Sequence, residues 1–445
     1  MTKKEYAELE EQGCALLGDS MKTVAGEGEN VTLFNTLGFE RSDVVSLPKE
    51  VSGALVAENG KVYPIQTLED RGVAYVENLP SKGYESFKVE STAKAPSSFR
   101  RQGNCLETPF YTVEVDENGL LSSVFDKKNK REVLQQGKKG NLFCMYEDKP
   151  IYYDNWDIDI YYTEKSWEIT ELSRMEWKEE GPVCTVLELE RKVSNSVIKQ
   201  KIYFYADSAR IDFETYVDWK EHHLKVHFPV DIHTDEAAFD VQFGNLTRKV
   251  HTNTSWDMAR FESCGQKWID LSEGHYGVSL LNDCKYGHSV KDSVIGLTLI
   301  KSGIEPNPVT DQEEHYFTYS LYPHEGNLRD CDTVRESYCL NYPVLAKEQT
   351  QAAGKASLLT VDKKNVMVET VKLAEDGNGM IIRAYEYENT KTHAELSLGM
   401  DKEIESVCEC NLMEEEIPGE IAHTDKGFDV DIKPFEIKTY RVILK

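Results

Sequence analysis

The residues from Tyr152 to Tyr162, YYDNWDIDIYY, are the most suggestive cluster of chemically capable side chains in the sequence, because aromatic rings alternate there with carboxylates. Two carboxylates about 5 to 10 Å apart can serve as the acid and the nucleophile or base of glycoside hydrolysis. In a strand, Asp157 and Asp159 would share one face, opposite Trp156. An edge strand with a wet acidic face is the competing interpretation.

A second polar cluster is the segment LNDCKYGH, which ends at His288. It follows one predicted strand and precedes another. A loop held by a rigid sheet is a common place for substrate contacts, which makes Tyr286 and His288 candidates for binding. A simple polar turn explains the same residues nearly as well.

Metal-binding and nucleotide-binding motifs receive little support. His223 and His227 are spaced H-x-x-x-H, but their apolar neighbours favour a strand and no zincin glutamate follows His223. Cys408 and Cys410 do not complete a zinc set. The sequence contains no G-x-S-x-G elbow and no P-loop, so acyl and phosphoryl transfer lack support.

The elements that must position these residues are mostly strands. Short alternating runs separated by Gly, Pro and Asn predict a mostly β chain with several antiparallel β-sandwich domains, one large and central, and one N-terminal helix. The helix has an apolar stripe that it cannot bury alone, so it must pack on a later or a preceding segment. The predicted domains are a helix at 1–25, a small sandwich at 30–92, a large sandwich at 105–345 and a small β-domain at 358–445.

The formal net charge of -27 excludes classes of partner. It repels polyanions over the whole surface, so nucleic acid and anionic membranes are not expected to bind, whereas a neutral glycan meets no penalty. The N-terminus has no apolar signal region, and no window approaches the roughly 18 apolar residues of a membrane span. A cytoplasmic location is expected.

Several long segments resemble the C-terminal region of α-mannosidases of glycoside hydrolase family 38, in particular the cytosolic and bacterial branch. The resemblance runs in order along nearly the whole chain. It rests on these stretches: VTLFNTLGFERSDVV, YDNWDID, HTNTSWDMARFESCGQKWIDLSE, GVSLLNDCKYGH, PNPVTDQEEHYFTYSLYPHEG and PFEIKTYRVIL.

The resemblance implies that a catalytic barrel and a helical bundle precede the β-domains, so that residues 1–25 would be the last helix of a truncated bundle. In this family a zinc ion and two aspartates carry out retaining hydrolysis of α-mannosides. The zinc motif H-x-H-x-D is absent from this sequence. We therefore expect neither catalytic residues nor metal ligands in this chain, zinc only with the missing catalytic domain, and no activity without a companion segment.

The resemblance implies site residues only in the C-terminal loops that, in this family, approach the active site from the β-domains. The segments holding Trp156, Asp157 and Asp159, and those holding Tyr286 and His288, are expected to line the α-mannoside pocket. A stand-alone carbohydrate-binding or assembly module without hydrolytic activity is the alternative. An autonomous glycosidase using Asp157 and Asp159 is a third hypothesis, weakened because residues two apart on one strand face are not opposed across a sugar ring.

Overall fold

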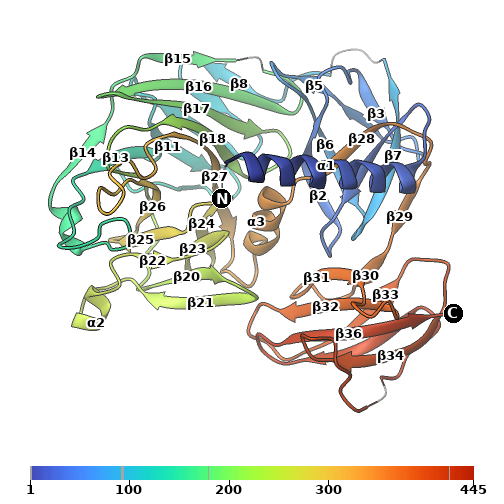
Figure 1. The fold of residues 1–445 in the computed structure, drawn as a ribbon. Helices are drawn as coiled ribbons and strands as arrows, with labels where there is room; N and C mark the ends of the chain where they lie inside the picture. The colour runs from blue at the N-terminus through green and yellow to red at the C-terminus, as the bar shows by residue number, and fades with distance from the viewer. Residues whose placement is uncertain (1–2, 92–94, 179, 420) are drawn as a thin grey trace. The chain divides into compact units, whose positions relative to one another are not determined.

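The chain forms two compact units, one of residues 1–95 with 342–445 and one of residues 96–341 (Figure 1). The computed structural model describes residues 3–91, 95–178, 180–419 and 421–445. Nearly all regular structure in both units is antiparallel β-sheet, and a helix stands at the N-terminal end. The predicted fold class, mostly β with several antiparallel sandwiches and an N-terminal helix, is confirmed.

The unit of residues 96–341 contains three antiparallel sheets. The nine-stranded sheet has the order β15 (Arg174–Trp177), β16 (Cys184–Val193), β17 (Ser196–Tyr205), β18 (Ile211–Asp218), β27 (Glu314–Glu325), β24 (Tyr276–Asn282), β23 (Trp268–Glu273), β20 (Glu236–Val241) and β21 (Gly244–Lys249). The six-stranded sheet has the order β14 (Ser166–Ile169), β13 (Leu142–Tyr146), β19 (His223–Pro229), β26 (Val294–Lys301), β25 (Gly287–Lys291) and β22 (Ser263–Cys264). The five-stranded sheet has the order β12 (Arg131–Glu132), β11 (Leu121–Asp126), β10 (Tyr111–Val115), β9 (Cys105–Glu107) and β8 (Arg100–Gln102).

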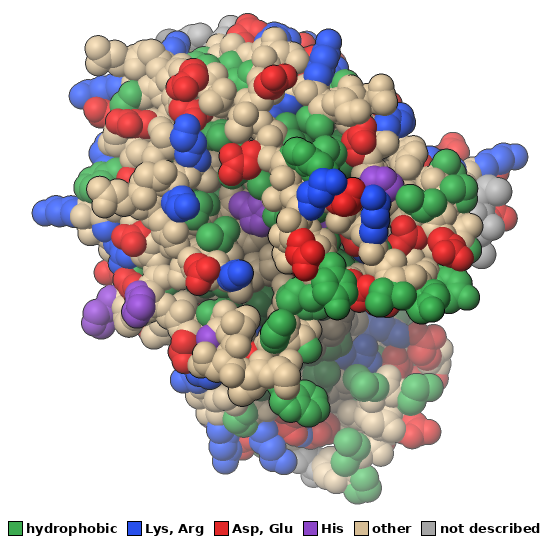
Figure 2. All heavy atoms as spheres, turned by 90° about the vertical axis from the view of Figure 1, so that its left-hand side faces the viewer, with side chains coloured by type: hydrophobic (Ala, Val, Ile, Leu, Met, Phe, Trp, Pro, Cys, Tyr) green, Lys and Arg blue, Asp and Glu red, His purple; other side chains and the backbone are tan. Residues whose placement is uncertain are grey.

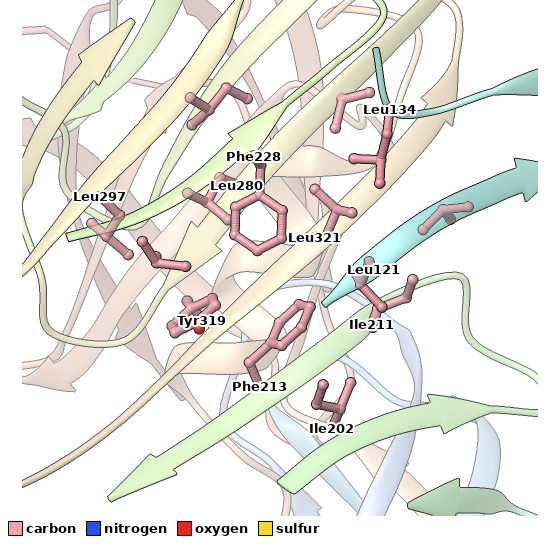
Figure 3. Packing of buried hydrophobic residues seen from close by; sticks show 14 of the residues in the cluster. Leu121, Leu134, Ile202, Ile211, Phe213, Phe228, Leu280, Leu297, Tyr319 and Leu321 are labelled. Atoms are coloured by element: carbon pink, nitrogen blue, oxygen red, sulfur yellow. The ribbon is translucent and has the colours of Figure 1, made fainter. Parts of the chain in front are cut away.

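One continuous apolar core joins these sheets (Figure 3). Phe213 of β18 stacks on Tyr319 of β27 with ring centroids 5.0 Å apart, and its ring meets Phe228 of β19 edge-on at 5.5 Å. All three rings are fully or almost fully buried. Burying a side chain of this size contributes about 1.5–3 kcal/mol, so the contacts between the nine- and six-stranded sheets stabilise the unit strongly.

This unit also contains short helices that the sequence pattern did not predict: the 3₁₀ helix η1 (Ile160–Glu164), α2 (Ser255–Met258) and α3 (Thr333–Asn341). In α3 the buried face includes Thr333, Ser337 and Tyr338 together with Val334. Because three of these buried residues carry hydroxyl groups, the apolar period that marks a helix is hidden. The prediction of one N-terminal helix therefore missed α3.

The other unit contains two β-sandwiches, each with its own core. The first has sheets of β28 (Leu345–Thr350), β1 (Asn30–Asn35), β7 (Gly83–Glu90), β3 (Ala54–Val56), β4 (Val62–Pro64) and β29 (Lys355–Ser357), and of β2 (Arg41–Leu47), β6 (Gly72–Leu79) and β5 (Gln66–Thr67). The second has sheets of β30 (Leu359–Val361), β33 (Thr392–Leu398) and β35 (Gly427–Ile432), and of β31 (Val366–Leu373), β32 (Met380–Glu386), β36 (Ile437–Leu444) and β34 (Ile404–Cys410). Strand β28 pairs with β1, so segments about 300 residues apart in sequence build one sheet.

The N-terminal helix α1 (Lys3–Ala25) exposes its apolar stripe. Leu9 is 61% exposed and Leu16 is 70% exposed, and Ala25 is the buried residue of the helix. No helix within the described ranges is long and apolar enough to cross a membrane. The stripe is an exposed apolar surface of the described chain.

Candidate functional site

Three loops gather at one end of the six-stranded sheet. Tyr146 at the end of β13 pairs with His223, and His223 pairs with Lys301 at the end of β26. Gly287 at the start of β25 pairs with Thr298 of the same β26. The register therefore places the loops of residues 147–159, 283–286 and 302–313 at the same end of the sheet.

The segment with alternating rings and carboxylates is not a strand, which corrects the expectation from its pattern. Tyr153 has a positive φ of 50°, and its carbonyl accepts hydrogen bonds from the backbone N–H groups of Trp156 and Asp157 at 2.9 and 3.1 Å. The chain turns there instead of extending. Asp159 accepts a hydrogen bond from the backbone N–H of Ile151 at 3.0 Å. The two aspartates thus do not share a strand face.

Asp154 ties this loop to the loop of residues 302–313. Its two carboxylate oxygens accept hydrogen bonds from the backbone N–H groups of Ile304 and Glu305 at 2.8 and 2.6 Å. Burial raises the pKa of Asp154, but these hydrogen bonds and the Lys301 charge outweigh it and lower the pKa below its ordinary value. A carboxylate held by two backbone donors fixes loop geometry as a helix cap does.

Aromatic side chains stand exposed on the fixed loop. Tyr152 is 71% exposed and Trp156 is 76% exposed, and the Tyr153 ring lies between them with centroid distances of 6.5 and 5.8 Å. Figure 2 shows hydrophobic side chains among charged ones on the side of the molecule where β14 and α2 lie in Figure 1. Exposed rings with polar edges and nearby carboxylates form a surface that suits a neutral, hydroxyl-rich ligand.

A buried polar layer lies beneath the loops, on one face of the sheet. Lys225 of β19 is fully buried, and its ammonium donates to Glu262 Oε2 at 2.6 Å, to Ser289 Oγ at 3.0 Å and to Tyr162 Oη at 3.2 Å. Burial raises the pKa of Glu262, but the Lys225 charge and hydrogen bond outweigh it, so the net pKa is lowered. Tyr162 belongs to η1, so this ion pair anchors the end of the aromatic loop to the sheet.

His223 and His227 lie on the same strand face, as their spacing in a strand requires, with Lys225 between them. His227 Nε2 is 2.7 Å from the Tyr146 hydroxyl, and His223 Nδ1 is 3.3 Å from Asp148. Burial and the Lys225 charge lower the pKa of His227 to about 3. The ammonium between the two rings disfavours a metal cation at this position.

The second predicted cluster divides into an exposed and a buried residue. Tyr286 is 47% exposed, whereas His288 is completely buried. His288 Nδ1 lies 3.2 Å from the carbonyl oxygen of Tyr286, and burial lowers the pKa of His288 to about 4. The imidazole therefore holds the backbone under Tyr286 and does not reach the surface itself.

Sequence reasoning did not single out Asp154, Lys225 or Glu262. A lysine between apolar residues of a strand, in HLKVHFP, is a signal that Lys225 needs a buried partner. Nothing in the local pattern marks Glu262 as that partner, because it comes from a loop 37 positions away.

Comparison with known proteins decides the family. The family description "Glycosyl hydrolases family 38 C-terminal domain" matches residues 106–309, and "Glycosyl hydrolases family 38 C-terminal beta sandwich domain" matches residues 365–440. The chain belongs to the C-terminal region of glycosyl hydrolase family 38. The family 38 chain is 32% identical to α-mannosidase G of Dictyostelium discoideum over 93% of its own length and 40% of that protein. It is 30% identical to human α-mannosidase 2C1 over 99% of its own length and 42% of that protein.

The family 38 chain thus spans about 40% of the length of these relatives. A crystal structure of an α-mannosidase from Enterococcus faecalis V583 has the same fold, with a TM-score of 0.73, 18% identity, and coverage of 94% of this chain and 56% of that one. Within the described residues, no group of three or more His, Cys, Asp or Glu side chains is arranged to hold a metal ion.

Proposed function

We propose that the chain is the C-terminal β part of a zinc-dependent, retaining α-mannosidase and is inactive without the catalytic barrel. The observation that carries this proposal is 30–32% identity to proteins named α-mannosidases over 93–99% of the chain. The sequence lacks the H-x-H-x-D motif that the family resemblance associates with zinc, so a companion segment would supply the metal ligands. The exposed leucines of α1 support such a companion, because they offer it an apolar surface.

A direct assay tests inactivity. The purified chain is incubated with a nitrophenyl α-mannoside, with zinc or cobalt added, and release of nitrophenol is expected to equal the blank. Turnover that Asp157→Asn abolishes would show that the chain carries its own catalytic carboxylate.

We further propose that Trp156, Asp157, Asp159 and Tyr286 face an α-mannoside, with His288 positioning Tyr286 from below. The support is their position on loops at one end of the six-stranded sheet, with the Trp156 ring exposed beside Tyr153. The stand-alone carbohydrate-binding module is the second candidate function, because the same exposed rings could bind a glycan without hydrolysis. A reading frame upstream that encodes the H-x-H-x-D barrel favours the first candidate, and its absence favours the second.

Trp156→Ala is expected to weaken binding of a mannobiose about five-fold, since an aromatic contact is worth roughly 1 kcal/mol. Isothermal titration calorimetry measures the change. Trp256→Ala is the matched control, because Trp256 on α2 is 78% exposed, almost the same as Trp156 at 76%. Equal losses in both variants would contradict the assignment of Trp156.

A cytoplasmic location is also proposed, and cell fractionation tests it.

A further inference from the structure

The unit of residues 96–341 contains a cavity of about 640 Å³ that is separate from the loops described above. Cys331 and His324 form part of its wall. Cys331 is 9% exposed and His324 is 5% exposed, so both side chains are largely buried at the inner side of the cavity. A thiol and an imidazole beside a cavity are a pair with known nucleophilic chemistry.

Buried hydrogen bonds hold both groups in place. His324 Nε2 lies 2.8 Å from Asp270 Oδ1, and the Asp270 carboxylate also accepts from Ser279 Oγ at 2.8 Å. Ser279 is 2.7 Å from the Thr333 hydroxyl, which is 3.1 Å from the Cys331 sulfur. The chain of contacts thus runs from the imidazole through Asp270 to the thiol.

The orientation of His324 leaves its second ring nitrogen for the thiol. Nε2 is engaged with Asp270, while the buried Nδ1 has no hydrogen bond of good geometry. Burial lowers the pKa of His324, but hydrogen bonding to Asp270 and Cys331 outweighs it and raises the pKa to about 10. The imidazole therefore carries a proton on both nitrogens at neutral pH, and the Nδ1 proton has no geometrically good acceptor among the described residues.

Two further features fit this arrangement. Cys331 lies two residues before Thr333, where the nine-residue helix α3 begins, and the N-terminal end of a helix favours negative charge. Gly277, paired with His324 across β24 and β27, leaves the space for the ring: a Cβ there would lie 2.3 Å from His324 Cε1. The helix end is thus a favourable place for negative charge, and the glycine makes room for the imidazole.

We propose that Cys331 is a modification site: a nucleophilic thiol that small neutral hydroperoxides reach through this cavity and oxidise to a sulfenic acid. The sulfur attacks the distal peroxide oxygen, and an S–O bond forms as the O–O bond breaks. The leaving hydroxide or alkoxide takes the proton from His324, and the imidazole takes the thiol proton in its place. Sulfur loses two electrons, the peroxide gains them, and water or an alcohol is released.

The charges around the cavity favour a neutral oxidant. Its wall includes the carboxylates of Asp126, Glu325, Asp330 and Asp332. Lys128, which also lines the cavity, is already paired with Glu325 at 2.5 Å. Anionic reagents are repelled by such a wall, whereas hydrogen peroxide is not.

The test treats the folded chain with hydrogen peroxide in the presence of dimedone, which traps sulfenic acids, and measures each cysteine by mass spectrometry. Cys331 is expected to be trapped about ten-fold faster than Cys284, because the thiolate is the reactive form. Cys284 is an exposed residue, but burial of its sulfur and the Asp283 carboxylate raise the pKa of its thiol to about 12. Cys284 is therefore a suitable comparison, because it is more exposed than Cys331 but its raised pKa disfavours the reactive thiolate.

His324→Gln is expected to slow trapping at Cys331 about ten-fold and to leave Cys284 unchanged, since the amide does not carry the proton. Ser272→Ala is the control, because Ser272 contacts Asp270 without touching the thiol. If His324→Gln does not fold, the rate of trapping at Cys331 is compared between the folded wild-type chain and the same chain unfolded in denaturant. Trapping at Cys331 that is no faster in the folded than in the unfolded chain, or that is unchanged in a folded His324→Gln variant, overturns the proposal. Neutral iodoacetamide should also outpace anionic iodoacetate at Cys331, and the reverse order contradicts the role of the acidic wall.

Discussion

At the scale of single residues, burial sets the chemistry of the histidines under the candidate site. His227 and His288 have pKa values lowered to about 3 and about 4, mainly by burial. Both rings are therefore neutral in the folded chain at pH 7 and serve as hydrogen-bonding groups. They support the loops from within and are unsuited to act as cationic sugar contacts.

The lowered pKa values of His227 and His288 predict that the folded chain loses stability in mild acid. A histidine whose pKa is lowered on folding contributes stability that is present above the unfolded value near 6.5 and is lost as the pH falls toward the folded value. Between pH 6.5 and 5, each of these two histidines is expected to cost about 2 kcal/mol of unfolding free energy. Urea unfolding at the two pH values measures the change.

His227→Gln removes one titrating group and should reduce this acid sensitivity. The control is His393→Gln, because His393 is exposed on β33 and its replacement removes a histidine without touching a buried one. An identical pH dependence in the wild-type chain and in His227→Gln would show that His227 is not kept neutral by the fold.

At the scale of elements, the aromatic loop depends on a close approach between two loops. Asn155 donates its backbone N–H to the carbonyl of Glu305 at 3.2 Å, and Gly303 lies against it. A Cβ at position 303 would lie 1.9 Å from Asn155 Oδ1 and 2.8 Å from the Asn155 backbone nitrogen. The backbone atom cannot rotate away, so only glycine fits without a shift.

Gly303→Ala is therefore expected to separate the two loops and to speed proteolytic cleavage within residues 147–159, with little effect on the sheet beneath. Limited proteolysis with mapping of the cleavage sites measures this. Gly274→Ala is the matched control, since a Cβ there has no atom within 4 Å. Unchanged cleavage in Gly303→Ala would mean that the loop holds its shape without this contact.

At the scale of the whole molecule, the two units differ in how they are assembled from sequence. Among the described residues, the apolar core of the unit of residues 96–341 runs from Phe99 to Leu321, so it is contained in a continuous segment. The other unit needs both ends of the chain, because β1 pairs with β28 and β7 pairs with β29. Continuity of the core favours independent folding of the first and not of the second.

A fragment of residues 96–341 is accordingly expected to fold alone and to unfold in one cooperative urea transition. Circular dichroism and the spread of amide resonances in NMR spectra measure this. A fragment of residues 1–95 lacks β28 and β29 and should remain largely unfolded. Aggregation or a non-cooperative transition of the 96–341 fragment would contradict the prediction.

The sequence by itself determined the β class, the N-terminal helix and the family, because alternation, composition and long ordered stretches are local properties. Only the tertiary structure decided that the run around Trp156 is a turn, since Asp154 finds its donors about 150 residues away. It also decided that Tyr286 is exposed and His288 buried, and that Cys331 and His324 line the same cavity. The physical reason is the same in each case. Pairing between strands that are distant in sequence brings each polar group to its partner, and a local sequence pattern does not contain that information.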